Sequence, residues 1–97
     1  MVPACFTIAR SLRVPGLGLL VLPEAPAPAW LMAHSLHTAL HLRLHRPGEP
    51  SLPLPATIEE IAHNEEPSAR ALLLDADPGK VPAGAWLELL ALAPEWS

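Results

Sequence analysis

Histidines recur between His34 and His45, and their spacing determines whether this chain could bind a metal. On an α-helix, His34, His37 and His41 would lie along one stripe, because residues three and four apart are neighbours there. Paired histidines one helical turn apart bind zinc, so a helix would predict a metal site. On a β-strand, His37 and His41 lie about 13 Å apart, too far to share one ion.

The stretch from His37 to His45 alternates between polar and apolar residues, which favours the strand. The side chains expected to point inward are Thr38, Leu40, Leu42 and Leu44. Arg46-Pro47-Gly48 then ends the run in the manner of a hairpin turn. We therefore expect the histidines to form a polar row that faces solvent. A structural or enzymatic metal site built from His34, His37 and His41 on a helix, with Asp75 or Asp77 as a further ligand, is the alternative.

The remaining reactive groups do not form a catalytic motif. Asp75 and Asp77 could share a hard cation from one face of a strand, but Asp77-Pro78-Gly79 is also an ordinary turn sequence. Cys5 lies beside Phe6 in an apolar context typical of inert thiols. The glycines around Leu17 lack the Lys-Ser/Thr of a phosphate-binding loop. We predict no catalytic residues, no cofactor and no enzymatic activity.

Composition narrows the class of protein. The chain has 97 residues, 51% of them hydrophobic and 16% charged, which predicts one folded domain over residues 1–97. Thirteen prolines oppose long helices. A net charge of −4 disfavours nucleic acid as the main partner. With one cysteine, no secretory leader and no apolar run of membrane-spanning length, we expect a cytoplasmic protein that does not enter a membrane.

Short strands separated by proline and glycine turns account for most of the chain. Residues 6–14 alternate, with Phe6, Ile8, Leu12 and Val14 on one face and Arg10 as the exception on that face. The glycines expected to form turns are Gly16, Gly18, Gly79 and Gly84. Residues 28–36 could form a short helix that begins at Pro28. The pattern predicts an all-β fold: a small, closed or partly open, Greek-key-like barrel of about six strands, with a short helix or loop inserted near residues 28–36.

Two surfaces are candidates for binding. Trp30, Leu31 and Met32 lie in the proline-rich insertion, and aromatic and methionine side chains are enriched in interfaces. Pro53 and Pro55 would place their segment at a sheet edge, where a second copy could pair to form a homodimer. These features predict a non-enzymatic module that binds another protein, whose identity the sequence does not give.

The chain also resembles the second, β-barrel domain of translation GTPases such as elongation factor Tu. That domain runs aromatic-x-Ile, then a Gly-x-Gly corner and a run of valines, an outline similar to Phe6-Thr7-Ile8, Pro15-Gly16-Leu17-Gly18 and Leu19-Leu20-Val21. The segments resembling its later strands and last turn are 40–44, 69–74 and 81–84.

Departures from this family limit what the resemblance implies. Leu17 stands where the family usually has arginine, Pro23 stops a strand that usually continues, and the GTPase domain is absent. The resemblance implies the barrel fold and, as an alternative function, a translation accessory that contacts RNA or the ribosome. It does not imply GTP hydrolysis.

Overall fold

Six segments of alternating or continuous apolar sequence form β-strands in a computed structural model, which describes residues 4–63, 66–75, 78–82 and 84–92. The elements are β1 (Cys5–Val14), β2 (Gly18–Pro23), α1 (Ala29–Ala33), β3 (Ala39–His45), β4 (Leu52–His63), β5 (Glu66–Leu74) and β6 (Trp86–Leu92). The expected short helix is therefore present, and residues 39–45 form a strand, as their alternation predicts.

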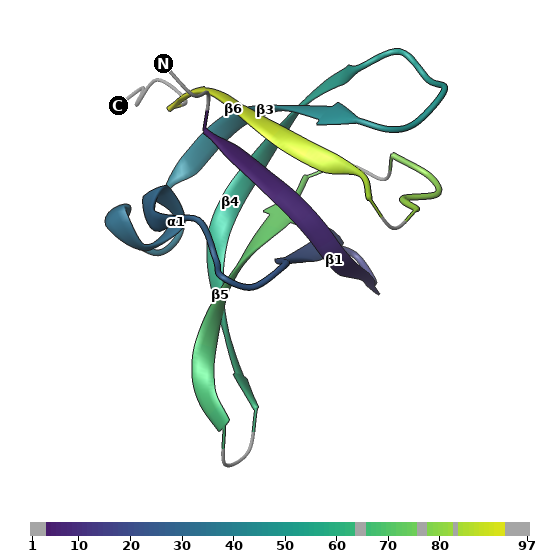
Figure 1. Ribbon diagram of the computed structural model, residues 1–97. Coiled ribbons are helices and arrows are strands. Elements are labelled where there is room, and N and C mark those ends of the chain that lie inside the picture. The colour runs from purple at the N-terminus through teal and green to yellow at the C-terminus, as the bar shows by residue number, and fades with distance from the viewer. Residues whose placement is uncertain (1–3, 64–65, 76–77, 83, 93–97) are drawn as a thin grey trace.

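The strands close into one antiparallel barrel in the order β1-β2-β5-β4-β3-β6. Strands β3, β4 and β5 are consecutive neighbours, and β6 returns to lie beside β3, which is the Greek-key arrangement. The far ends of β4 and β5 project away from the rest of the barrel (Figure 1). The predicted all-β, Greek-key-like barrel of about six strands is confirmed.

Alternate residues of each strand fill the barrel interior. Leu40, Leu42 and Leu44 of β3 are fully buried, as predicted. They meet Phe6 and Ile8 of β1 in a single hydrophobic cluster. Other members of this cluster are Leu19, Val21, Leu31, Leu54, Ala56, Ile58, Leu72, Leu74, Ala85 and Leu87.

A β-bulge between Ile8 and Arg10 reverses the faces of β1. One extra residue in a strand moves every later side chain to the opposite face. Arg10 is therefore exposed, whereas the alternation predicted it on the apolar face. Leu12 was expected to point inward but is 53% exposed. Its outward position is the first element of the surface described below.

Pro53 and Pro55 lie in β4 where that strand has a partner on one side. Both pair with β3, whereas β5 joins β4 only from Ala56 onward. The Pro55 carbonyl accepts a hydrogen bond from the Asp75 amide at 3.0 Å, so this edge faces the end of β5. Proline supplies no amide hydrogen, and the edge therefore offers fewer donors to an added strand.

The predicted turn glycines all have positive φ angles, at Gly16, Gly18, Gly79 and Gly84. Gly16 sets the shape of the turn at the site described below. Its φ of 80° follows Pro15, and the Leu17 amide donates to the Val14 carbonyl at 3.0 Å. Proline followed by a left-handed residue inside such a hydrogen bond is the pattern of a type II turn. The turn joins β1 to β2 and fixes the position of Leu17.

Candidate functional site

An uncharged row of side chains crosses the outside of the barrel. Cross-strand pairing aligns Leu12 of β1 with Leu20 of β2, and Leu20 with Leu73 of β5. Leu73 is paired with Thr57 of β4, and Thr57 with Ala39 of β3. The neighbours of these residues along β2 and β5, such as Val21 and Leu72, are buried in the core, so the row faces outward. We call these five residues the uncharged row.

Leu17 projects beside this row from the β1–β2 turn and is 60% exposed. A hollow of about 320 Å³ lies between it and the outer surface of β4 and β5. Its lining includes Ala39, Pro55, Thr57 and Leu73, which extends the uncharged row to the turn, and Asp75 borders it as the one charged residue. The Leu17 side chain is therefore a protrusion with a mostly apolar depression beside it.

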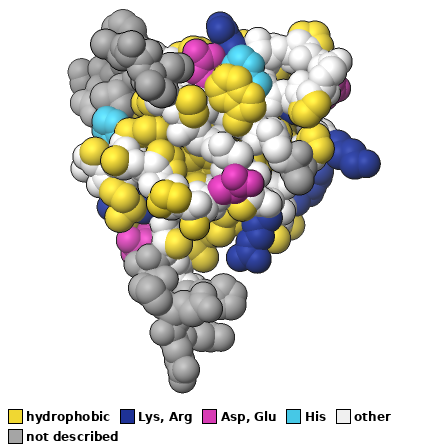
Figure 2. Space-filling model, in the orientation of Figure 1, with side chains coloured by type: hydrophobic (Ala, Val, Ile, Leu, Met, Phe, Trp, Pro, Cys, Tyr) yellow, Lys and Arg dark blue, Asp and Glu magenta, His cyan; other side chains and the backbone are white. Residues whose placement is uncertain are grey.

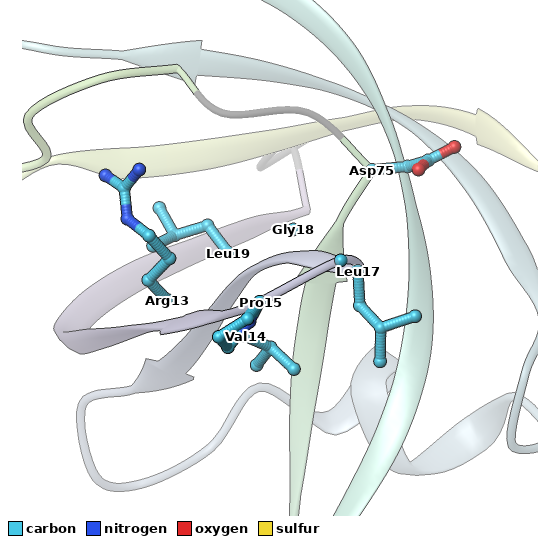
Figure 3. Close-up of a pocket in the computed structure, with 8 residues that line it drawn as sticks. Arg13, Val14, Pro15, Leu17, Gly18, Leu19 and Asp75 are labelled. Carbon is cyan, nitrogen blue, oxygen red and sulfur yellow. The ribbon is translucent and has the colours of Figure 1, made fainter.

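A second hollow of about 290 Å³ lies at the turn itself. Arg13 and Asp75 both border it, together with residues 14–19. In Figure 3 these two charged residues lie on opposite sides of the turn, with Leu17 on the Asp75 side. Positive and negative groups thus flank one apolar centre. We call the whole surface the Leu17 face and define it by Leu12, Leu17, Leu20, Ala39, Pro55, Thr57 and Leu73.

The outside of β3 and β6 has a different character. His41 and Arg43 point outward from β3, between its buried leucines. The ring of His45 stacks on Trp86 with centroids 3.9 Å apart, and its Nε2 lies 3.0 Å from a Glu88 carboxylate oxygen. The partly exposed ring of Trp86 is thus already stacked against His45 within the chain. The uncharged character of the Leu17 face is therefore not a general property of the barrel exterior.

The predicted contact patch at Trp30, Leu31 and Met32 needs correction. Leu31 is 0% exposed and belongs to the core, so it cannot contact a partner. Trp30 also packs against the core, and its Nε1 donates to the Cys5 carbonyl at 3.1 Å. Only Met32, 59% exposed, keeps the surface position expected of it. The short helix turns Trp30 and Leu31 inward because it covers the core at this point.

The histidines of the alternative metal site are separated by changes of backbone conformation. Helix α1 ends at Ala33, His34 is its C-cap, and His37 has a left-handed backbone with φ of 67°. His41 lies beyond this turn, on the outer face of β3. Among the described residues, no three His, Cys, Asp or Glu side chains are grouped to hold a metal ion. The helical stripe that would bring the histidines together does not form.

The other polar candidates are also dispersed. His37 Nδ1 lies 3.2 Å from a Glu59 carboxylate oxygen, at a site where the histidine side chain is largely exposed. Asp75 is exposed at the rim of the Leu17 face, and Asp77 lies outside the described residues. Hydrophobic side chains cover much of the side that carries β1 and α1, with charged groups scattered between them (Figure 2). Apolar contact is thus the chemistry that this side of the molecule supports.

Comparison with known proteins gives no relative from which a function could be transferred. No family model, no curated protein and no solved structure matches the chain. Within the described ranges, no helix combines the length and the apolar character required to cross a membrane. The Leu17 face must therefore be interpreted from its own geometry.

Proposed function

We propose that this chain is a non-enzymatic binding module of the cytoplasm, and that it contacts a protein partner through the Leu17 face. One observation carries the proposal: five outward side chains, aligned across five neighbouring strands, include no charge. The fold does not require this, because outward positions of a small barrel can be polar, as His41 and Arg43 of β3 are. Charge is depleted at the centre of protein interfaces.

The shape of the surface supports the same function. Leu17 and the hollow beside it offer a protrusion and a depression, which allow side chains of a partner to interdigitate. The type II turn holds Leu17 in place before a partner arrives. A preorganised contact loses less conformational entropy on binding than a mobile one does.

The resemblance to the second domain of translation GTPases supports a docking role as well. In that family the β-barrel domain contacts neighbouring domains and assemblies. The present chain also forms a closed barrel. We propose that this barrel performs the docking function alone. The partner surface would then be a protein surface with an apolar centre and charges at its edges.

Site-specific photo-crosslinking tests the proposal. A photoreactive phenylalanine replaces Leu17 in one variant and Met32 in a control, since these side chains are 60% and 59% exposed. After irradiation in a lysate of the native host treated with RNase, we expect a discrete crosslinked protein from position 17 and none from position 32.

Equal crosslinking from both positions, or none from position 17, would contradict the assignment of the Leu17 face. Loss of the position 17 product on RNase treatment would instead support the RNA-linked alternative. A Leu17→Asp variant provides a second check. Leu17 is an exposed turn residue, so the barrel should still fold, but the new carboxylate places a charge at the apolar centre of the face. Met32→Asp is its matched control.

A further inference from the structure

One edge of β4 is paired along only part of its length. Successive residues of a strand direct their backbone N–H and C=O groups to opposite edges. Ile58 faces the β3 side, because its amide donates to the Thr38 carbonyl at 3.2 Å and its carbonyl accepts from the His37 amide at 2.7 Å. Glu60 and Ala62 therefore direct their backbone groups to the same side. No described segment pairs with β4 on this side beyond Ile58.

The pairing ends at Ile58 because the neighbouring chain turns away. His37 has a left-handed backbone with φ of 67°, and the Thr38 amide and hydroxyl donate to the Ser35 carbonyl at 3.3 and 2.6 Å. This turn connects α1 to β3, whereas β4 continues beside β5. No other helix or strand lies beside the far ends of β4 and β5 in Figure 1. We call the outward backbone groups of Glu60 and Ala62 the open edge of β4.

The opposite edge of β4 differs in its supply of hydrogen-bond donors. The Pro55 carbonyl accepts from the Asp75 amide, so Pro53 and Pro55 face the side on which β5 ends. Neither proline has an amide hydrogen to offer an added strand. The open edge carries no proline, and its donors and acceptors alternate as the backbone of an extended peptide requires. Its chemistry is that of a strand-addition site.

An unpaired carboxylate lies beside the open edge. The Glu60 side chain is exposed and has no ion-pair partner among the described residues. Its cross-strand neighbour Arg70 directs Nη1 to the His34 carbonyl instead, at 2.6 Å. Glu59 projects from the other face of the strand and lies 3.2 Å from His37 Nδ1. An added strand would thus meet the negative charge of Glu60 on one of its faces.

This charge distinguishes between the strands that could be added. A second copy of the chain would bring the same pair of glutamates and a further net charge of −4. Like charges placed opposite each other across two strands are destabilising, and charged edge residues oppose pairing between copies. A lysine or arginine of a different chain would instead pair with Glu60.

We infer that the open edge of β4 binds an extended, basic segment of another polypeptide, which adds a strand beside Glu60 and Ala62. Backbone hydrogen bonds hold the segment, and Glu60 selects a lysine or arginine on one face of it. The inference goes beyond the proposed function, because it uses backbone groups at the far end of β4 and not the Leu17 face.

An NMR titration of the isotope-labelled full chain tests this site. The probe is a synthetic peptide of about eight alternating lysine and valine residues, which can form one short strand. We expect saturable shifts and slower hydrogen exchange at the amides of Glu60 and Ala62, which gain acceptors. The same peptide with every backbone amide N-methylated cannot donate hydrogen bonds and should not bind. A counterpart with glutamate in place of lysine should bind at least about tenfold more weakly.

A proline substitution tests the backbone contact. The register shift near Ile61 adds its extra residue to β5, so the alternation of β4 continues to Ala62. Ala62→Pro therefore removes an amide that faces away from β5 and leaves the pairing with β5 intact. It should raise the Kd of the basic peptide by about tenfold. Ala62→Val keeps the amide and should leave the Kd unchanged.

Charge reversal tests the choice of partner. Glu60→Lys should raise the Kd of the basic peptide by about tenfold or more and lower that of the acidic one. Glu24 is exposed elsewhere, so Glu24→Lys makes the same change in net charge and should alter either Kd by less than about twofold. The amide spectrum of each variant reports whether the barrel is folded.

Three results would overturn the inference. The first is an absence of shifts at Glu60 and Ala62 with millimolar basic peptide. The second is equal binding of the N-methylated peptide, which would show that side chains alone make the contact. The third is a dimer of the chain that Ala62→Pro abolishes, because the occupant of the edge would then be a second copy.

Discussion

Replacing Leu31 by alanine should destabilise the barrel much more than replacing its neighbour Met32. Leu31 is 0% exposed and belongs to the hydrophobic core, whereas Met32 is 59% exposed on the same turn of α1. The helix has five residues and no side-chain hydrogen bond at its N-cap, so local interactions alone do not stabilise it. The burial of Leu31 and Trp30 therefore holds this helix on the barrel.

The size of the effect follows from the burial of Leu31. Leucine-to-alanine changes in a core cost about 2–5 kcal/mol, from lost transfer free energy and from the cavity that remains. With about 3 kcal/mol at Leu31, the melting temperature of a domain of this size should fall by roughly 12–24 °C. Met32→Ala removes an exposed side chain and should change the free energy of unfolding by less than about 0.5 kcal/mol.

Urea denaturation followed by tryptophan fluorescence measures both variants, with thermal unfolding as a second readout. The slope of the unfolding free energy against urea should be unchanged, so the midpoint alone reports the loss. Equal effects of Leu31→Ala and Met32→Ala would refute the assignment of Leu31 to the core. They would also reinstate the contact patch that the sequence predicted at residues 30–32.

Two further substitutions test the turn and the loop that precedes β6. Gly16→Ala should cost about 1 kcal/mol, because φ is 80° there and no atom lies within 4 Å of the added Cβ, so the cost is conformational. An unchanged urea midpoint would contradict the type II turn. Arg46→Met removes an Nη1 hydrogen bond of 2.6 Å to the Pro78 carbonyl and an ion pair to Glu49. We expect faster amide hydrogen exchange at residues 79–81 and a loss of about 2 kcal/mol, whereas unchanged exchange would show that Arg46 does not hold the loop.

Sequence alone was sufficient where polar and apolar residues alternate without interruption. In β3, the buried leucines and the outward His41 and Arg43 follow strict period two, so the strand and its faces could both be predicted. The same pattern decided between the competing interpretations of the histidines. A helix would have placed Leu42 on the side opposite Leu40 and Leu44, and the core could not then have buried all three.

Sequence was insufficient where one residue changes the phase of a strand. The bulge after Ile8 depends on how β1 pairs with β2, a contact between distant strands that residues 6–14 do not encode locally. The exceptional position of Arg10 was the available signal. Arginine on an apolar face is costly, and a bulge that turns it outward removes that cost. The same change of phase exposes Leu12.

The Leu17 face was missed for a related reason. Leu19-Leu20-Val21 and Leu72-Leu73-Leu74 are continuous apolar runs, which also occur in strands buried on both faces. In a small barrel only one face of each strand is covered by the core, so Leu20 and Leu73 must point outward. In such a strand, alternate residues of an apolar run are buried in the core. The residues between them form an apolar outer surface that is available for contact. The distinction becomes visible only when the strands are paired, because pairing aligns the second set of side chains into one uncharged row beside Leu17.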